Sequence, residues 1–413
     1  MTVNFEQFAK ASLVGVFLSF PMFLGLANTF MALALLFWLL AGHFAERWQA
    51  VRGHPLTWPA IGMFALVVLG VFYTVAPLDQ AMRHVGKYSK FLFIPLALSL
   101  LTEGVWRSRC LYAFWMAMLF TLASTYAGIW WSVPWSVSRG NLGWGVDHTV
   151  FKDHIAQGLL MSTFVLLALA QGFKTQSKLN KCGWLVVALL AAMSILFLSH
   201  GRSGYLALLV GLGVFGWVWF AHPLRKFLAI LLLIMAAVLS YFSSPVLQGR
   251  VNQGYAEVVS ALARPVNQSD EAITSLGIRI DMWRVSVQSI IERPILGSGT
   301  GSYPVLAQQA FHSPALLSTA GVHPHNQFLF FGVELGLVGL LGYVFYLYRA
   351  GTAGRHMSLP DKAALCGFIA IMVSDSLFHG ALWLAVENHL FTFMLALLAA
   401  MPEAKQEPST QTG

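Results

Sequence analysis

The sequence predicts an all-α polytopic membrane protein with about twelve transmembrane helices and one large outer loop that contains short helices. Of its 413 residues, 57% are hydrophobic and only 10% are charged, and the mean hydropathy is +0.67. Soluble domains carry about 25% charged residues. The apolar runs are continuous rather than alternating, and a helix satisfies its own backbone hydrogen bonds inside about 30 Å of hydrocarbon. This pattern argues against a transmembrane barrel.

Twelve apolar runs, separated by polar breaks, define the predicted membrane helices. They cover residues 9–25, 27–42, 59–76, 85–102, 110–131, 154–172, 183–199, 204–221, 226–243, 326–348, 362–379 and 386–401. We therefore divide the chain into residues 1–243 with helices one to nine, 244–325 as the large outer loop, 326–401 with helices ten to twelve, and 402–413 as a disordered tail. The first run has no small-residue cleavage site after it, so we expect a retained helix.

The distribution of basic residues predicts that both termini lie in the cytoplasm. Short loops on that side would hold Arg47, Arg52, Arg107, Arg109, Lys174, Lys178, Lys181, Arg225, Lys226, Arg349 and Arg355, as the positive-inside rule expects. Arg83, Lys87 and Lys90 depart from the rule because they fall at the outer side of the fourth run. Two explanations stay open: the boundary of that run is wrong, or these cations face an anionic ligand.

Cysteine usage and net charge exclude several classes of function. Cys110, Cys182 and Cys366 have no CxxC spacing, which argues against a disulfide framework or a thiolate metal site. The net charge of +8 is scattered through short loops rather than gathered on a polar face, so we expect no nucleic-acid partner. We also expect no cofactor.

The large outer loop contains a predicted helix over residues 276–292, with Ile278, Met282, Val285 and Ser289 along one stripe. Arg279 and Trp283 are four residues apart and share another face. Arg279 could bind phosphate, or a nearby carboxylate such as Asp281 could neutralise it. Arg264 and Arg284 are reserve cations. The glycine-rich segment 297–302 follows a helix and a proline rather than a strand, so it is interpreted as a flexible turn and not as a dinucleotide-binding motif.

Arg202 is the informative residue of the break between the seventh and eighth runs. A guanidinium offers a rigid fork of donors that matches phosphate oxygens and stays charged at any relevant pH. Two interpretations remain open. Arg202 binds the phosphate of a substrate, or it lies at the interface and binds ordinary lipid headgroups.

The segment His323-Pro324-His325-Asn326 sets two imidazoles and an amide at the start of the tenth run. A positioned histidine can take the proton from an attacking alcohol, because imidazole titrates near neutrality. A zinc site that also uses His312 is one alternative, although the spacing is irregular. Simple packing at a helix cap formed by Asn326 is the other.

Together these motifs resemble the bacterial O-antigen ligase family of membrane glycosyltransferases, which share a domain with O-antigen polymerases and protein O-oligosaccharyltransferases. The likeness covers the layout of most of the chain and three short motifs. The arginine followed four residues later by leucine is met by Arg202 and Leu206, and the histidine followed eleven residues later by glycine is met by His325 and Gly336. The loop arginine followed by tryptophan corresponds to Arg279 and Trp283.

The resemblance implies transfer of a preassembled glycan from undecaprenyl diphosphate to a sugar hydroxyl of lipid A-core, at the periplasmic face of the bacterial inner membrane. It implies inversion at the anomeric carbon and no metal. His325 would be the general base, and Arg202 and Arg279 would clamp the diphosphate. His323, Asn326, Trp283, Arg264 and Arg284 are possible supporting residues.

Other functions stay open at this point. An O-antigen polymerase or a protein O-oligosaccharyltransferase would use the same clamp with another acceptor. A transporter of the lipid-linked glycan belongs to a different class of function, and twelve membrane helices are common among transporters. Transporters usually place their site near the midplane between paired halves, whereas the polar candidates here gather on one side.

Overall fold

The computed structural model describes residues 4–263, 274–311, 317–318 and 321–401, and within these ranges the chain is built from helices with no strand. The helices are α1 (Phe5–Ser19), α2 (Leu24–Ala41), α3 (Phe44–Val51), α4 (Thr57–Val71), α5 (Leu78–Tyr88), η1 (Ser89–Leu92), α6 (Phe93–Leu100), α7 (Gly104–Ala127), α8 (His154–Lys174), α9 (Lys178–Leu198), α10 (Arg202–Trp219), α11 (Pro223–Ser243), α12 (Pro245–Ala263), α13 (Ser275–Glu292), α14 (Tyr303–Ala310), α16 (Gln327–Thr352), α17 (Leu359–Phe378), α18 (Ala385–His389), η3 (Leu390–Met394) and α19 (Leu395–Ala399).

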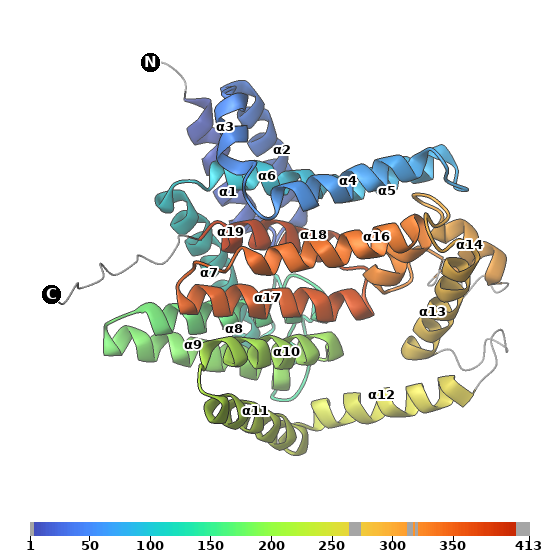
Figure 1. The fold of residues 1–413 in the computed structure, drawn as a ribbon. Coiled ribbons are helices and arrows are strands. Elements are labelled where there is room, and N and C mark those ends of the chain that lie inside the picture. The colour runs from blue at the N-terminus through green and yellow to red at the C-terminus, as the bar shows by residue number, and fades with distance from the viewer. Residues whose placement is uncertain (1–3, 264–273, 312–316, 319–320, 402–413) are drawn as a thin grey trace.

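The predicted fold class of a polytopic, all-helical membrane protein is confirmed. Seven helices in the described part of the chain are long and apolar enough to cross a membrane, namely α2, α7, α8, α9, α10, α11 and α16. Shorter apolar helices, α4 and the segment Ala385–Ala399, accompany them. Each of the twelve predicted runs overlaps a helical segment. Figure 1 shows these helices bundled together, with α12, α13 and α14 gathered at one end. The orientation of the helices across the membrane stays a prediction.

The fourth predicted run, residues 85–102, is not one helix. The chain forms α5, a single turn of 3₁₀ helix in η1, and then α6. Pro95 explains the break, because it has no amide hydrogen to donate to the carbonyl of Phe91 and is tolerated only in the first turn of a helix. The polar residues of α5 therefore lie on a separate amphipathic helix rather than within a membrane span.

The segment 294–302, between α13 and α14, is inserted into a kink of α16. The amides of Ser298 and Gly299 donate to the carbonyls of Val333 and Glu334, each at 2.8 Å. The amide of Leu337, beyond the kink, donates to the carbonyl of Pro294 at 2.8 Å. Residues 297–302 do form a turn, as predicted, but the turn is anchored rather than flexible, because its backbone groups replace the bonds that α16 lacks at its kink.

The kink lies at Gly336, whose φ of 62° and ψ of −155° are far from helical values. A Cβ atom at this position would lie 2.3 Å from the carbonyl oxygen of Ile295. Only glycine adopts this conformation without steric cost and lets the loop backbone approach so closely. Nearby, the buried Glu334 carboxylate pairs with His84 Nδ1 at 2.6 Å and accepts a bond from the amide of Gly301.

We expect Gly336→Ala to destabilise the protein, because backbone strain alone costs about 1–3 kcal/mol and the clash with Ile295 adds to it. The melting temperature of detergent-purified protein should fall by several degrees. Gly249→Ala is the matched control, since Gly249 lies exposed in α12 with nothing within 4 Å of the added Cβ. Equal melting temperatures for the two variants would contradict the steric account of the kink.

Candidate functional site

Arg202 and Arg279 line one cavity of about 150 Å³ at the end of the bundle where α12 and α13 lie. Arg202 opens α10, immediately after Gly201. A Cβ at Gly201 would lie 2.6 Å from the carbonyl oxygen of His154, so glycine is needed for α10 to start this close to α8. Ser203, Leu206, Leu276, Ser374, Asp375 and Phe378 complete the lining. The two arginines are far apart along the chain, and the fold brings them to the same cavity.

The carboxylate of Glu257 holds one side of this cavity. Its Oε2 lies 3.4 Å from both Nη1 and Nη2 of Arg202 and accepts a bond from the amide of Leu276 at 3.1 Å. Glu257 is only 5% exposed. It therefore ties α12 to the first turns of α10 and α13. The contacts to Arg202 are long, so the guanidinium keeps donor capacity toward the cavity.

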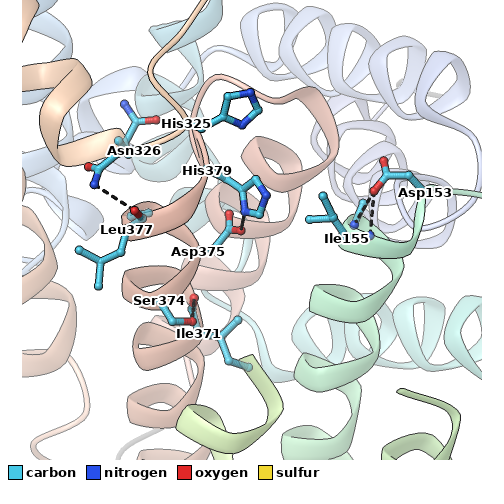
Figure 2. Close-up of polar contacts among 12 residues, drawn as sticks. Asp153, Ile155, His325, Asn326, Ile371, Ser374, Asp375, Leu377 and His379 are labelled. Carbon is cyan, nitrogen blue, oxygen red and sulfur yellow. Dashed lines mark hydrogen bonds and ion pairs between the residues drawn. The ribbon is translucent and has the colours of Figure 1, made fainter. Parts of the chain in front are cut away.

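His379, which directly follows α17, connects the arginines to the histidine motif. Its Nε2 lies 3.3 Å from Arg279 Nη2, and its Nδ1 lies 2.9 Å from Oδ1 of Asp375, one turn earlier on α17. Figure 2 shows this pair below His325. A guanidinium can only donate, so Nε2 must accept and the Nδ1 proton must point to Asp375. These contacts fit a neutral His379 with a fixed tautomer.

The His-Pro-His segment is anchored on three sides. Trp283 Nε1 donates to the carbonyl of Pro324 at 3.0 Å. Asn326 caps α16 by accepting from the amide of Leu329 and donates through Nδ2 to the carbonyl of Leu377, each at 2.9 Å (Figure 2). Asn326 is thus a cap, as one alternative expected, but it also fixes the segment to α17. The face shared by Arg279 and Trp283 points toward this site from α13.

His325 lies between His323 and His379, with ring centroids 4.1 Å and 6.0 Å away. It adopts a left-handed backbone conformation with φ of 49°, which is uncommon outside glycine and is often found at functional sites. Its Nδ1 is buried and has no hydrogen-bond partner within the described residues. A buried imidazole nitrogen without a partner is available to a substrate hydroxyl or a water.

Burial and neighbouring groups keep His323 and His325 neutral. Burial lowers the pKa of His325 to about 2, with further lowering from His323, Arg279 and His379. The pKa of His323 falls to about 4, chiefly through burial and then through His379, Lys87 and Arg279. Burial, followed by the charge of Arg202, also lowers the pKa of Arg279. The site therefore combines neutral proton acceptors with two guanidinium groups that repel each other.

Comparison with known proteins identifies the central part of this chain. Residues 185–344 match the O-antigen ligase family model. The resemblance inferred from the motifs is confirmed over this segment, which contains Arg202, Arg279 and His325. The match supports a membrane glycosyltransferase of the O-antigen ligase and polymerase type.

An uncharacterized protein from Haemophilus influenzae (strain ATCC 51907 / DSM 11121 / KW20 / Rd) is 28% identical over 200 residues, which cover 46% of this chain and 48% of that protein. The chain thus spans about half the length of this curated relative.

The segment that matches the family model does not include every polar residue of the site. Asp375 and His379 lie beyond residue 344, and the sequence reasoning missed both. A signal was present, since Asp375 is an ionisable residue near the end of an apolar run and His379 follows at a spacing of four, on the same helix face.

Some predicted residues stand apart from the site or outside the described ranges. Arg284 lies 3.4 Å from Asp281 Oδ1 and lines neighbouring cavities rather than the one shared by Arg202 and Arg279. Arg264 and His312 fall outside the described residues. Among residues that the structure describes, no three His, Cys, Asp or Glu side chains are grouped so as to hold a metal ion.

The low pKa values of His323 and His325 predict that the fold around these histidines is acid-sensitive. An unfolded histidine has a pKa of about 6.5, so below this pH the unfolded state binds more protons than the folded state. Stability must then fall as the pH drops from 6.5 toward 4. We expect the melting temperature to fall over this range, and less steeply in His323→Asn, which removes one of the two groups. His222→Asn, at an exposed helix cap, should retain the wild-type slope. Identical slopes in all three proteins would contradict the assignment.

Proposed function

We propose that this protein is an O-antigen ligase. It transfers a preassembled glycan from undecaprenyl diphosphate to a sugar hydroxyl of lipid A-core, at the periplasmic face of the bacterial inner membrane, with both termini in the cytoplasm. The observation that carries this proposal is the convergence of two guanidinium groups and a neutral histidine within the described part of the chain. Arg202 and Arg279 share a cavity, and His379 links Arg279 to the neighbourhood of His325.

The two arginines suit the donor's diphosphate. A guanidinium binds phosphate oxygens through two parallel bonds, and preorganised cations stabilise negative charge as it develops on a leaving group. A diphosphate is stable as an anion once it departs, so no general acid is required on that side. A diphosphate bound between Arg202 and Arg279 would also offset the repulsion between the two guanidinium groups. After burial, this repulsion is the next cause of the lowered pKa of Arg279.

An apolar cleft adjoins the arginine cavity and suits the lipid part of the donor. This cleft of about 580 Å³ shares Leu276, Arg279 and Phe378 with the smaller cavity. Val258, Ile280, Trp283, Arg284, Val287 and Gln288 complete its lining. A lipid diphosphate needs a charged end and an apolar end side by side, because the cost of exposing the isoprenoid to water is proportional to its area.

His325 suits the role of general base. The acceptor oxygen attacks the anomeric carbon from the face opposite the diphosphate, the bond from that carbon to the phosphate oxygen breaks, and its electron pair leaves with the diphosphate. The acceptor's proton passes to an imidazole nitrogen of His325, and the anomeric configuration inverts. A low pKa makes His325 a weak base in the empty site. The negative charge of a bound diphosphate would raise that pKa and strengthen the base.

The test is an in vitro reaction with purified protein, lipid-linked glycan and rough lipopolysaccharide, with and without a chelator. Product should form in both conditions. A second lipid-linked glycan or a pilin peptide, offered in place of lipopolysaccharide, distinguishes a polymerase or a protein oligosaccharyltransferase. Movement of labelled glycan across vesicles without covalent transfer would instead favour a transporter.

In this reaction His325→Ala should abolish transfer, because it removes the imidazole whose buried Nδ1 has no partner within the described residues. The loss should be about 100-fold or more in kcat, as for removal of a general base. His356→Ala, an exposed histidine at the other end of α16, should behave as wild type. Size-exclusion profiles and melting temperatures establish that both variants are folded. Full transfer by a folded His325→Ala protein would exclude the role as base.

Alanine at Arg202 or Arg279 should weaken use of the donor by about 10- to 100-fold in kcat/KM, the range for a charged hydrogen bond. Lysine should restore activity only partly, because a point charge cannot reproduce the guanidinium fork. Arg293→Lys, at the exposed end of α13, is the matched control. Donor KM is measured at saturating acceptor. If the Arg202 and Arg279 variants all used the donor as wild type does, the diphosphate clamp would be refuted.

A further inference from the structure

A second group of cations, Lys87, Lys90 and Lys152, gathers around α18. Lys87 and Lys90 come from α5 and η1, and Lys152 lies just before α8. Figure 1 shows α5, which carries Lys87, and α10, which opens with Arg202, on opposite sides of α16 and α17. We propose that these three lysines bind phosphate or carboxylate groups on the acceptor saccharide. This inference rests on the proposed function, since it assigns the second substrate of the same site.

Lys87 is fixed against the segment that leads into α18. Its Nζ donates to the carbonyl of Trp383 at 3.2 Å and lies 4.9 Å from the centre of the indole ring. Asn388 Nδ2 donates to the carbonyl of Lys87 at 3.1 Å. Lys90 follows on η1, one turn further along. These contacts hold the end of α5 and η1 against α18.

Lys152 approaches the same helix from the start of α8. It interacts electrostatically with Glu387, and both Lys90 and Lys152 interact with His389. Figure 2 shows Asp153, the residue next to Lys152, across from Asp375 and His379. The three lysines therefore surround α18, next to the imidazoles of the catalytic site.

The positive charge of this group is not balanced by the protein. Within the described residues, Lys90 and Lys152 form no hydrogen bond or salt bridge. Glu387 is the carboxylate that interacts with Lys152 from α18, and it is 5% exposed. Asp153 is engaged in capping α8, where Oδ1 accepts from the amides of Ile155 and Ala156. Lys152 interacts with both Asp153 and Glu387, so three ammonium groups face two carboxylates. This leaves an excess positive charge, which an anionic ligand can offset.

His389 gives a second, independent indication of a ligand. Its side chain is fully buried, Nδ1 lies 2.6 Å from the carbonyl of Ala385, and Nε2 has no partner within the described residues. It directly precedes the π-helical turn η3, a feature that often marks a functional site. A buried polar atom without a partner is costly unless a ligand or water satisfies it.

The acceptor is the better occupant because the arginine cavity already accounts for the diphosphate. Ammonium groups are compact point charges that accept phosphate in many orientations, which suits a branched, charged saccharide better than one fixed diphosphate. Held by the lysines, such a saccharide would extend a hydroxyl toward His325. Arg83 is not included, since it is 75% exposed and pairs with Asp79 at 2.6 Å on the same helix.

The test measures binding rather than transfer, with full-length protein in detergent. Labelled protein is titrated with rough lipopolysaccharide, with the same material after chemical dephosphorylation, and with phosphatidylglycerol nanodiscs. Lys90→Gln/Lys152→Gln is compared with Lys90→Arg/Lys152→Arg and with Lys178→Gln, an exposed lysine at the start of α9. Geranylgeranyl diphosphate serves as the probe of the arginine cavity.

We expect the glutamine double variant to bind rough lipopolysaccharide at least about tenfold more weakly, which is about 1.4 kcal/mol. It should match wild type on dephosphorylated material and on geranylgeranyl diphosphate. The arginine double variant and Lys178→Gln should bind as wild type.

Equal weakening on phosphorylated and dephosphorylated material, or no weakening in a folded variant, would overturn the proposal. An effect of the same size on phosphatidylglycerol nanodiscs would assign the lysines to membrane lipid instead. Binding that depends on phosphate in a protein that fails to ligate would refute the ligase function and leave the saccharide site standing.

Discussion

The repulsion between Arg202 and Arg279 is the constraint on which the site depends. Two guanidinium groups lining one small cavity are costly where water is scarce, and only nearby carboxylates make this arrangement stable. Glu257 contacts Arg202, while Asp375 acts on Arg279 through His379. These carboxylates come from α12 and α17, and the arginines come from α10 and α13. The charge balance of the site therefore also holds these four helices together. The contacts between Glu257 and Arg202 are long, so both guanidinium groups can still donate to an anion bound in the cavity.

The kink at Gly336 explains why the histidine and this glycine are separated by eleven residues. His325 and Gly336 stand at the two ends of the first part of α16, about three helical turns long. At one end Asn326 fixes the histidine segment to α17, and at the other the loop 294–302 enters the kink. That loop follows α13, which carries Arg279. The motif therefore joins His325, the proposed base, and the helix that carries Arg279 to the same stretch of α16.

The sequence predicted the helices and three central site residues because these signals are local. Hydrophobic runs identify helices, and Arg202, Arg279 and His325 are unusual residues at breaks between runs. The contacts that organise them are not local, since Arg279 and His379 are 100 residues apart. The order of segment 297–302 was missed for the same reason, because the amides of Ser298 and Gly299 donate to carbonyls of α16 far along the chain. Pro95 is a local signal for the break near residue 92, but the continuous hydropathy of this run led to the prediction of one helix.

In the proposed reaction, the electrostatic layout would link the strength of His325 as a base to the presence of the donor. In the empty site, burial together with His323, Arg279 and His379 holds the pKa of His325 to about 2. A diphosphate between the arginines adds negative charge near His325 and removes part of that depression. His325 would then accept a proton readily only when a lipid-linked donor is in place. Such coupling needs no moving part. It follows from placing two fixed cations beside a buried imidazole and letting the substrate supply the balancing charge.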